Sequence, residues 1–282
     1  MPFADLDAFC GALTDPDREV EVFVNIDYRS GAAAIGGWAA RWNDLSVQNT
    51  TRNGCLAPPG STPRNPTRTT AGALRHTPPA GGSSLFVPRF AVCSASTAGL
   101  WMLYDRLGDV SGFSGAVNTA QIISGGVNDG SRYTDPEGNL AFVQIYSQIG
   151  TTATTFTVSY TNQDGVSGRT SHPALIGGTG YREAGKWLPI PLQAGDTAAI
   201  SVESLTLAAS TGTAGDIGVT IVKPLKTVAT GSSGLAGDSG FLTDGVVSRV
   251  MDDACLCVAQ YESATTGAVN AQAQLSITLL ED

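Results

Sequence analysis

The run Leu140-Ala-Phe-Val-Gln-Ile-Tyr-Ser-Gln-Ile149 is the first of several strand-like segments in residues 139–225, and this stretch decides the fold class. Further segments follow at residues 155–161, 187–192, 198–207 and 215–222. Each has alternating apolar residues or a high content of β-branched residues, with Gly, Asn, Asp or Pro around it. The pattern predicts an all-β body, either a jelly roll or a β-sandwich.

The composition suits such a body. The chain has 282 residues, enough for one large β domain or a domain with an appendage, and 34 of them are glycine. Charged residues make up 15% of the chain, against about 25% in typical globular proteins. A low charge is also expected where much surface is hidden in an assembly, because the cores of interfaces are depleted in charge.

The charge balance and the apolar runs exclude two classes of partner. The net charge of −9 argues against general nucleic-acid binding, which needs a basic face. No apolar run reaches the length of about 18 residues that a membrane helix requires, so no membrane partner is expected. Residues 1–7 are acidic and lack the basic start of an export signal, so synthesis in the cytoplasm is expected.

The first 14 residues predict a short amphipathic helix. Phe3, Leu6 and Phe9 recur at near-helical spacing, and Asp15-Pro-Asp17 ends the pattern. The helix either packs on its own domain or docks as an arm on a neighbouring subunit through Phe3 and Phe9. The predicted division is therefore an N-terminal helix or arm at residues 1–14 and a β body at residues 15–282.

The rest of the body has weaker signals. Apolar alternation predicts further strands at residues 19–28, 84–93, 99–107, 254–261 and 271–280. Trp38 and Trp42 are four residues apart, which predicts a short helix. The Asp164-Gly165 pair predicts a hairpin turn. Residues 230–245 are rich in Gly and Ser and are expected to form a loop.

Residues 51–84 predict a long extended loop or arm within the β body. They are rich in Pro, Thr, Ser and Gly and offer little for a packed core. No acidic residue occurs between Asp44 and Asp105, whereas five arginines do. One interpretation is a basic strap that crosses onto an acidic neighbouring surface, and the other is a solvated linker. The candidate partner-binding cations are Arg52, Arg64, Arg68, Arg75 and Arg89.

The chain has five cysteines: Cys10, Cys55, Cys93, Cys255 and Cys257. In a reducing cytoplasm they are expected to be small buried or exposed thiols. Alternatively, some oxidise to disulfides in an assembly that is released to an oxidising medium, and the odd count leaves one for an intermolecular bond. Cys255 and Cys257 point to one face of a strand, where packing or oxidation is favoured over a zinc site.

The other candidate motifs lack the residues that their chemistry needs. Gly237-Asp-Ser-Gly240 matches the core of a serine-protease motif, but the only histidines, His76 and His172, have unsuitable surroundings. The acidic residues of the 127–138 turn fit a solvated turn better than a calcium loop: Asp129, Asp135 and Glu137. We therefore expect no catalytic residues, no metal and no cofactor.

Several short runs, taken in order, resemble virion structural proteins of tailed bacteriophages. The resemblance covers about residues 99–225, and its main runs are Leu103-Tyr-Asp-Arg-Leu107, Gln144-Ile-Tyr-Ser-Gln-Ile-Gly150, Ile176-Gly-Gly-Thr-Gly-Tyr-Arg-Glu183 and Gly212-Thr-Ala-Gly-Asp-Ile-Gly-Val-Thr-Ile221. It implies a β-rich particle component attached to the head and no enzymatic activity, and it carries no catalytic residues to this chain.

The resemblance favours a capsid decoration or cement protein, made in the host cytoplasm and located in the virion. Its expected partners are the major capsid protein or other virion proteins, and it is expected to form a homotrimer. One alternative is a receptor-binding or lectin-like tail or fibre module that uses aromatic loop residues, with Tyr133, Tyr181 and Trp187 as candidates. A more remote alternative is a serine hydrolase built on Ser239.

Overall fold

Long antiparallel strands dominate the computed structural model of this chain. The structure describes residues 11–12, 19–28, 37–41, 59–70, 72–74, 76–79, 83–94, 99–230, 236–240, 247–262 and 271–281. Strands account for nearly all the regular structure in these residues, which confirms the all-β prediction. Of the helix predicted at residues 1–14, only Gly11 and Ala12 are described, and they have helical geometry. Within these ranges, no helix has the length and apolar character needed to cross a membrane.

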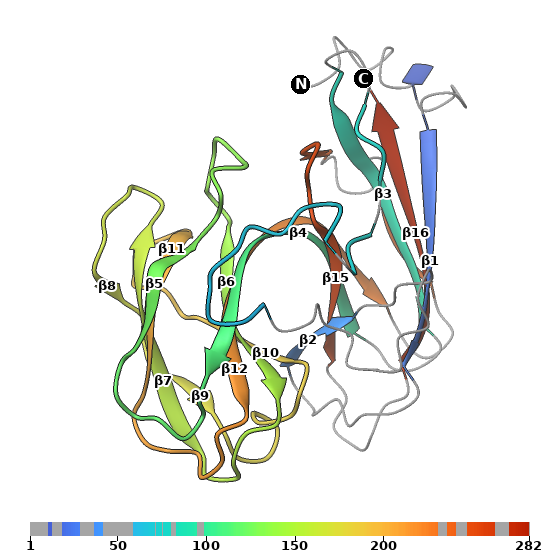
Figure 1. Ribbon diagram of the computed structural model, residues 1–282. Coiled ribbons are helices and arrows are strands. Elements are labelled where there is room, and N and C mark those ends of the chain that lie inside the picture. Colours follow the sequence, from blue (N-terminus) through green and yellow to red (C-terminus); the bar gives the residue numbers. More distant parts are fainter. Residues whose placement is uncertain are drawn as a thin grey trace.

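Two 15-residue strands, β4 (Gly99–Phe113) and β12 (Asp216–Thr230), form the spine of the molecule. They pair with each other from Ile217 opposite Phe113 to Thr230 opposite Gly99. Figure 1 shows that this pair runs from one lobe of the molecule into the other. Both strands are longer than the segments predicted at 99–107 and 215–222, because apolar alternation stops at buried charged and polar residues within them.

The spine belongs to a closed barrel with strand order β10-β2-β15-β4-β12-β6. The other members are β10 (Lys186–Pro189), β2 (Gly37–Arg41), β15 (Leu256–Glu262) and β6 (Leu140–Ser147). The short helix predicted around Trp38 is wrong, because Trp38 lies in β2 and pairs with Trp187 and Tyr261. Pairing on both sides closes the barrel and overrides a local spacing signal; Trp42 lies outside the described residues.

A second sheet joins the two ends of the chain. Its order is β1 (Glu19–Tyr28), β16 (Ala271–Glu281), β3 (Leu85–Ser94) and β13 (Ala236–Gly240), and β14 (Ser248–Val250) also pairs with β3. The loop predicted at 230–245 is wrong at residues 236–240. A Cβ atom at Gly237 would lie 2.3 Å from the Ala229 carbonyl oxygen, so close approach to β12 requires glycine in this strand.

The third sheet, which we call sheet C, has the order β5 (Gln121–Asn128), β11 (Ala199–Leu207), β7 (Thr154–Asn162) and β8 (Arg169–Thr170). A short strand, β9 (Ala174–Ile176), also pairs with β7. The predicted hairpin turn at Asp164-Gly165 is confirmed: it joins β7 to β8, and Gly165 has a φ angle of +75°.

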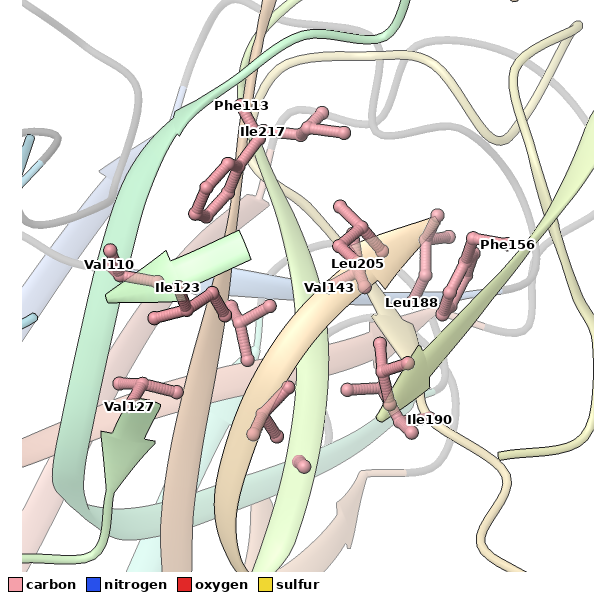
Figure 2. Close-up of a cluster of buried hydrophobic side chains, with 14 of the residues drawn as sticks. Val110, Phe113, Ile123, Val127, Val143, Phe156, Leu188, Ile190, Leu205 and Ile217 are labelled. Carbon is pink, nitrogen blue, oxygen red and sulfur yellow. The ribbon is translucent and has the colours of Figure 1, made fainter. Parts of the chain in front are cut away.

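Sheet C packs on the barrel strands β4, β6 and β12 and encloses the largest hydrophobic core (Figure 2). A second core lies between the β3–β16 sheet and strands β4, β12 and β15, and a third contains Trp187 and the two cysteines of the Cys255–Cys257 run. Strand β4 contributes to all three cores, through Leu107, Leu103 and Tyr104 respectively. The layers therefore pack as a β-sandwich around a shared spine.

Phe156→Ala tests the core under sheet C. Phe156 is fully buried, so its truncation is expected to lower the free energy of unfolding by about 3–5 kcal/mol, measured by urea unfolding. Val166→Ala is the control, because Val166 is 51% exposed and its truncation should change stability by no more than about 0.5 kcal/mol. Equal effects of the two substitutions would contradict this core assignment.

Candidate functional site at the centre of strand β4

Two buried carboxylates, Asp105 and Asp109, lie near the middle of β4. Neither side chain is exposed to solvent. Three arginines from separate parts of the chain reach them: Arg64 from residues 59–79, Arg106 from β4 itself, and Arg132 from the 129–139 loop. We call these five residues the ionic junction.

Asp109 holds two of the three guanidinium groups. Arg64 donates from Nε to Oδ1 at 2.7 Å and from Nη2 to Oδ2 at 3.2 Å, while Arg106 Nε lies 2.9 Å from Oδ2. The backbones of Arg64 and Asp109 also exchange two hydrogen bonds of 3.0 Å. A bidentate arginine–carboxylate pair of this kind is strong and geometrically specific. Arg64 is therefore fixed to β4 by both its side chain and its backbone.

Arg106 is the most deeply buried cation of the junction, with 1% of its side chain exposed. Its Nη2 donates to Gln144 Oε1 at 3.0 Å and to the Tyr146 hydroxyl at 2.7 Å, and its guanidinium lies 6.0 Å from the ring centre of Trp187. Burial by itself lowers the pKa of Arg106, but the Tyr146 oxygen and the Asp109 carboxylate outweigh it and raise the pKa above its ordinary value. Arg106 therefore remains charged inside the protein.

Asp105 forms an ion pair with Arg132, whose Nη1 lies 2.5 Å from Asp105 Oδ1. The same oxygen accepts a hydrogen bond of 2.7 Å from the backbone N–H of Cys255. Burial raises the pKa of Asp105 from 3.8 to about 6, and Arg132 and the Cys255 N–H only partly oppose this rise. The Tyr133 hydroxyl lies beside the same carboxyl, and burial raises the pKa of Tyr133. Arg132 also donates to the carbonyl of Pro66, which ties the 129–139 loop to the 59–79 segment.

The 59–79 segment lies along the part of β4 that β15 leaves uncovered. β15 pairs with β4 only from Gly99 to Asp105. Beyond that point, Ser111 N–H donates to the Gly60 carbonyl at 2.9 Å, and Asn65 Nδ2 donates to the Leu107 carbonyl at 2.8 Å. The segment thus satisfies backbone groups of β4 that would otherwise be buried without partners.

The far end of the segment is also held by the body of the chain. Leu74 forms a β-bridge with Leu256. His76 is buried, and burial lowers its pKa. In its described residues, the segment is therefore packed on its own β body.

The predicted partner-binding arginines that the structure describes form ion pairs within the chain. Besides Arg64, Arg68 lies 3.5 Å from Asp253, and Arg89 lies 3.0 Å from Asp238. The last two pairs are partly exposed, so they contribute little to stability. The other four predicted contact residues lie outside the described residues: Phe3, Phe9, Arg52 and Arg75.

Three of the five cysteines are described, and all three are free thiols. Cys255 and Cys257 are buried with their Sγ atoms 3.9 Å apart, on one face as predicted. Burial raises the pKa of the Cys257 thiol, which keeps it protonated and unreactive. Cys93 is exposed, and the remaining two, Cys10 and Cys55, lie outside the described residues.

The alternative functions lose support from the placement of their residues. Tyr133 and Trp187 were candidate exposed aromatics, but Trp187 is fully buried and the Tyr133 hydroxyl faces Asp105; only Tyr181 is exposed. Ser239 lies buried within β13, opposite Phe90 on β3, rather than in the exposed turn that a nucleophile needs. His172 lies between β8 and β9 of sheet C.

The acidic turn is held by a lysine. Lys223 Nζ donates to the carbonyl oxygens of Asp135 at 3.0 Å and Glu137 at 2.5 Å. Asp129 accepts hydrogen bonds from Ser131 N–H and Asn139 Nδ2. In the part of the chain that the structure describes, no group of three or more His, Cys, Asp or Glu residues is placed to hold a metal ion.

The ionic junction was missed by the sequence analysis, apart from Arg64. One signal was present: Asp105, Arg106 and Asp109 interrupt an apolar strand-like run in a chain that has few charges. Both Asp109 oxygens are occupied by arginine and closed to solvent, so this carboxylate is not accessible to a substrate. Its geometry is that of a structural fastening.

Comparisons with known proteins do not assign the chain to a family. No protein-family model matches the chain, and no curated protein is similar to it. Structural matches include an infectious bursal disease virus strain (Gt), at 10% identity over 95% of this chain and 84% of that chain, with a TM-score of 0.19. Cucumber leaf spot virus matches at 8% identity over 94% of this chain and 97% of that chain, with a TM-score of 0.14. Scores this low do not establish a shared fold, so no function is drawn from these structures.

Arg64→Gln tests the fastening of the 59–79 segment. The substitution removes a charge-assisted, bidentate contact with buried Asp109, so the free energy of unfolding is expected to fall by about 1–3 kcal/mol. Trypsin is expected to cleave after Arg68 faster than in the wild type, as followed by mass spectrometry. Arg89→Gln is the matched control, because its pair with Asp238 is exposed and contributes at most about 1 kcal/mol. Equal cleavage rates in the two variants would contradict the fastening.

Asp105→Asn tests the pH dependence that burial creates. With a pKa of about 6 in the folded chain against an ordinary 3.8, Asp105 binds its proton more tightly when folded. Its contribution to stability therefore rises as the pH falls through 6 towards 3.8. Between about pH 7.5 and pH 5, the wild type should gain on the order of 1 kcal/mol relative to the Asn variant in urea unfolding. His76 is present in both proteins, so its opposite dependence cancels. A constant difference across this range would refute the raised pKa.

Proposed function

We propose that this chain is a structural protein of a tailed-bacteriophage virion, a decoration or cement protein that binds the head shell. The observation that carries the proposal is the ionic junction, where buried charged groups fasten one part of the chain to another. Buried ion pairs that hold the chain in one rigid shape are suited to a structural protein. The resemblance of residues 99–225 to virion structural proteins of tailed phages supports the same class.

The proposed contact with the head shell uses the arginines that are not paired with Asp105 or Asp109. Arg68 and Arg89 keep 34% and 48% of their side chains exposed, so they remain accessible to an acidic partner surface. Arg52 and Arg75, together with Phe3 and Phe9, complete the proposed contact set. In this proposal, Arg64 acts indirectly, because it holds the 59–79 segment in place.

The expected partner is the major capsid protein or another virion protein, and the chain is expected to act in the virion after synthesis in the host cytoplasm. The homotrimer predicted from the sequence remains part of the proposal. A decoration protein needs no cofactor and no catalytic residue. The receptor-binding alternative is not favoured, because two of its three candidate aromatic side chains face the interior.

Immunogold labelling of purified particles with antibody against this chain tests the proposal. A decoration protein should place gold over the whole head. Gold confined to the tail would contradict the head assignment, and particles without label would contradict the virion assignment.

A binding assay tests the contact set separately. Purified chain carrying both Arg68→Glu and Arg89→Glu should co-sediment at least about tenfold less with undecorated heads than the wild type does, because two attractive contacts become repulsive. Arg182→Glu is the control, since Arg182 lies between β9 and β10 in the chain, and Figure 1 shows these two strands in the lobe remote from β3. Unchanged binding of the double variant would remove Arg68 and Arg89 from the contact.

A further inference from the structure

The outward face of sheet C is covered by small hydroxyl side chains. Along β7, Phe156, Val158 and Tyr160 point into the core, so the residues between them point outward. In β11, two register shifts interrupt the alternation, but Ser201, Ser204 and Thr206 lie opposite the outward-pointing Thr161, Ser159 and Thr157 of β7 and therefore share their face. Figure 1 shows sheet C on the side of its lobe that is remote from β1 and β16. We call this surface the hydroxyl face; its central residues are Thr157, Ser159, Thr161, Ser201, Ser204 and Thr206.

The hydroxyl face is nearly free of charge, although the chain as a whole has a net charge of −9. β7 and β11 contain one charged residue, Glu203, and Thr161 Oγ1 donates to its carboxylate at 2.8 Å. The register places Ser204 opposite Ser159 and Thr206 opposite Thr157, so hydroxyl groups lie side by side across the strands.

Two apolar side chains stand at opposite margins of this face. Ile122 on β5 is 69% exposed and Leu175 on β9 is 53% exposed, the highest values among the large hydrophobic residues that the structure describes. Their chain neighbours Ile123 and Ile176 are buried in the core beneath sheet C, so Ile122 and Leu175 point outward. Ile122 pairs with Ser204, and Leu175 pairs with Thr155, four residues along β7 from Ser159, so the two lie diagonally across the face.

We propose that the hydroxyl face binds a second copy of this chain, face to face about a two-fold axis. A hydroxyl group both donates and accepts hydrogen bonds, so a face of hydroxyl groups is complementary to itself. Two copies of the chain, each with a net charge of −9, repel each other. The repulsion is weakest between two hydroxyl faces, because the single carboxylate of β7 and β11, Glu203, is hydrogen-bonded to Thr161. This contact does not depend on the proposed role in a virion.

The two-fold axis gives the apolar residues a definite pairing. The axis that lies in the plane of the face and bisects the line from Ile122 to Leu175 exchanges their positions. In the dimer, Ile122 therefore contacts the partner's Leu175, and Leu175 contacts the partner's Ile122. Nine-residue strands spaced about 4.8 Å apart give a face of roughly 500 Å² on each partner. The total buried area of about 1,000 Å² is at the lower end for a specific interface. Association is accordingly expected at micromolar or higher concentration.

Sedimentation velocity of the full chain over a concentration series tests the proposal. The wild type should form an even-numbered species: a dimer, or a hexamer if another surface forms trimers. Ile122→Lys and Leu175→Glu alone should each raise the dissociation constant of this step at least about tenfold. The double variant should recover the association, because each new lysine faces a new glutamate on the partner. Leu140→Lys is the control, since Leu140 is 39% exposed and lies on β6, outside this face.

Three results would overturn the proposal. The first is a monomer or a bare trimer at every concentration up to about 1 mM. The second is an even-numbered species that survives both single substitutions. The third is loss of association in each single variant without recovery in the double variant, which would exclude the two-fold pairing. Melting curves of all variants confirm that each is folded, because both side chains are exposed and neither supports the core.

Discussion

The burial of two carboxylates on one strand is the constraint on which the rest of the structure depends. Removing ionised groups from water costs several kcal/mol each unless they are paired and hydrogen-bonded. The charges of Asp105 and Asp109 are compensated by Arg64, Arg106 and Arg132, and Arg106 in turn donates to Gln144 and Tyr146. The 59–79 segment, the 129–139 loop, β4 and β6 are therefore joined by one network of ion pairs and hydrogen bonds.

This junction lies where the spine passes from one core to the next. Strand β4 gives Leu103 to the core under the β3–β16 sheet and Leu107 to the core under sheet C. Asp105 and Arg106 lie between these two leucines, and Asp109 lies two residues beyond Leu107. A continuous apolar strand at this point would offer the 59–79 segment no specific attachment. The buried charged groups of β4 thus fix the position of the 59–79 segment, which has little apolar surface of its own.

The sequence predicts the regular strands well and the irregular ones poorly. β1, β3 and β7 are recognised because period-2 alternation is a local property of each segment. β2 and β13 are missed because barrel closure and a close approach to β12, both non-local, determine them. The candidate site is missed for the same reason: Arg64 and Asp109 are 45 residues apart, and Arg132 and Asp105 are 27 apart. The basic stretch was visible, but its acidic partners within the chain were not.

Hydrogen exchange of the purified chain, followed by mass spectrometry, tests the central claim most directly. The account predicts that peptides from residues 59–70 are protected nearly as strongly as those from β4, because both open only when the ionic junction breaks. The turn between β4 and β5 provides the fast-exchanging reference at residues 118–120, which are exposed and lie outside the strands. If residues 59–70 exchange as fast as that turn while β4 stays protected, the junction does not fasten the segment and the account is wrong.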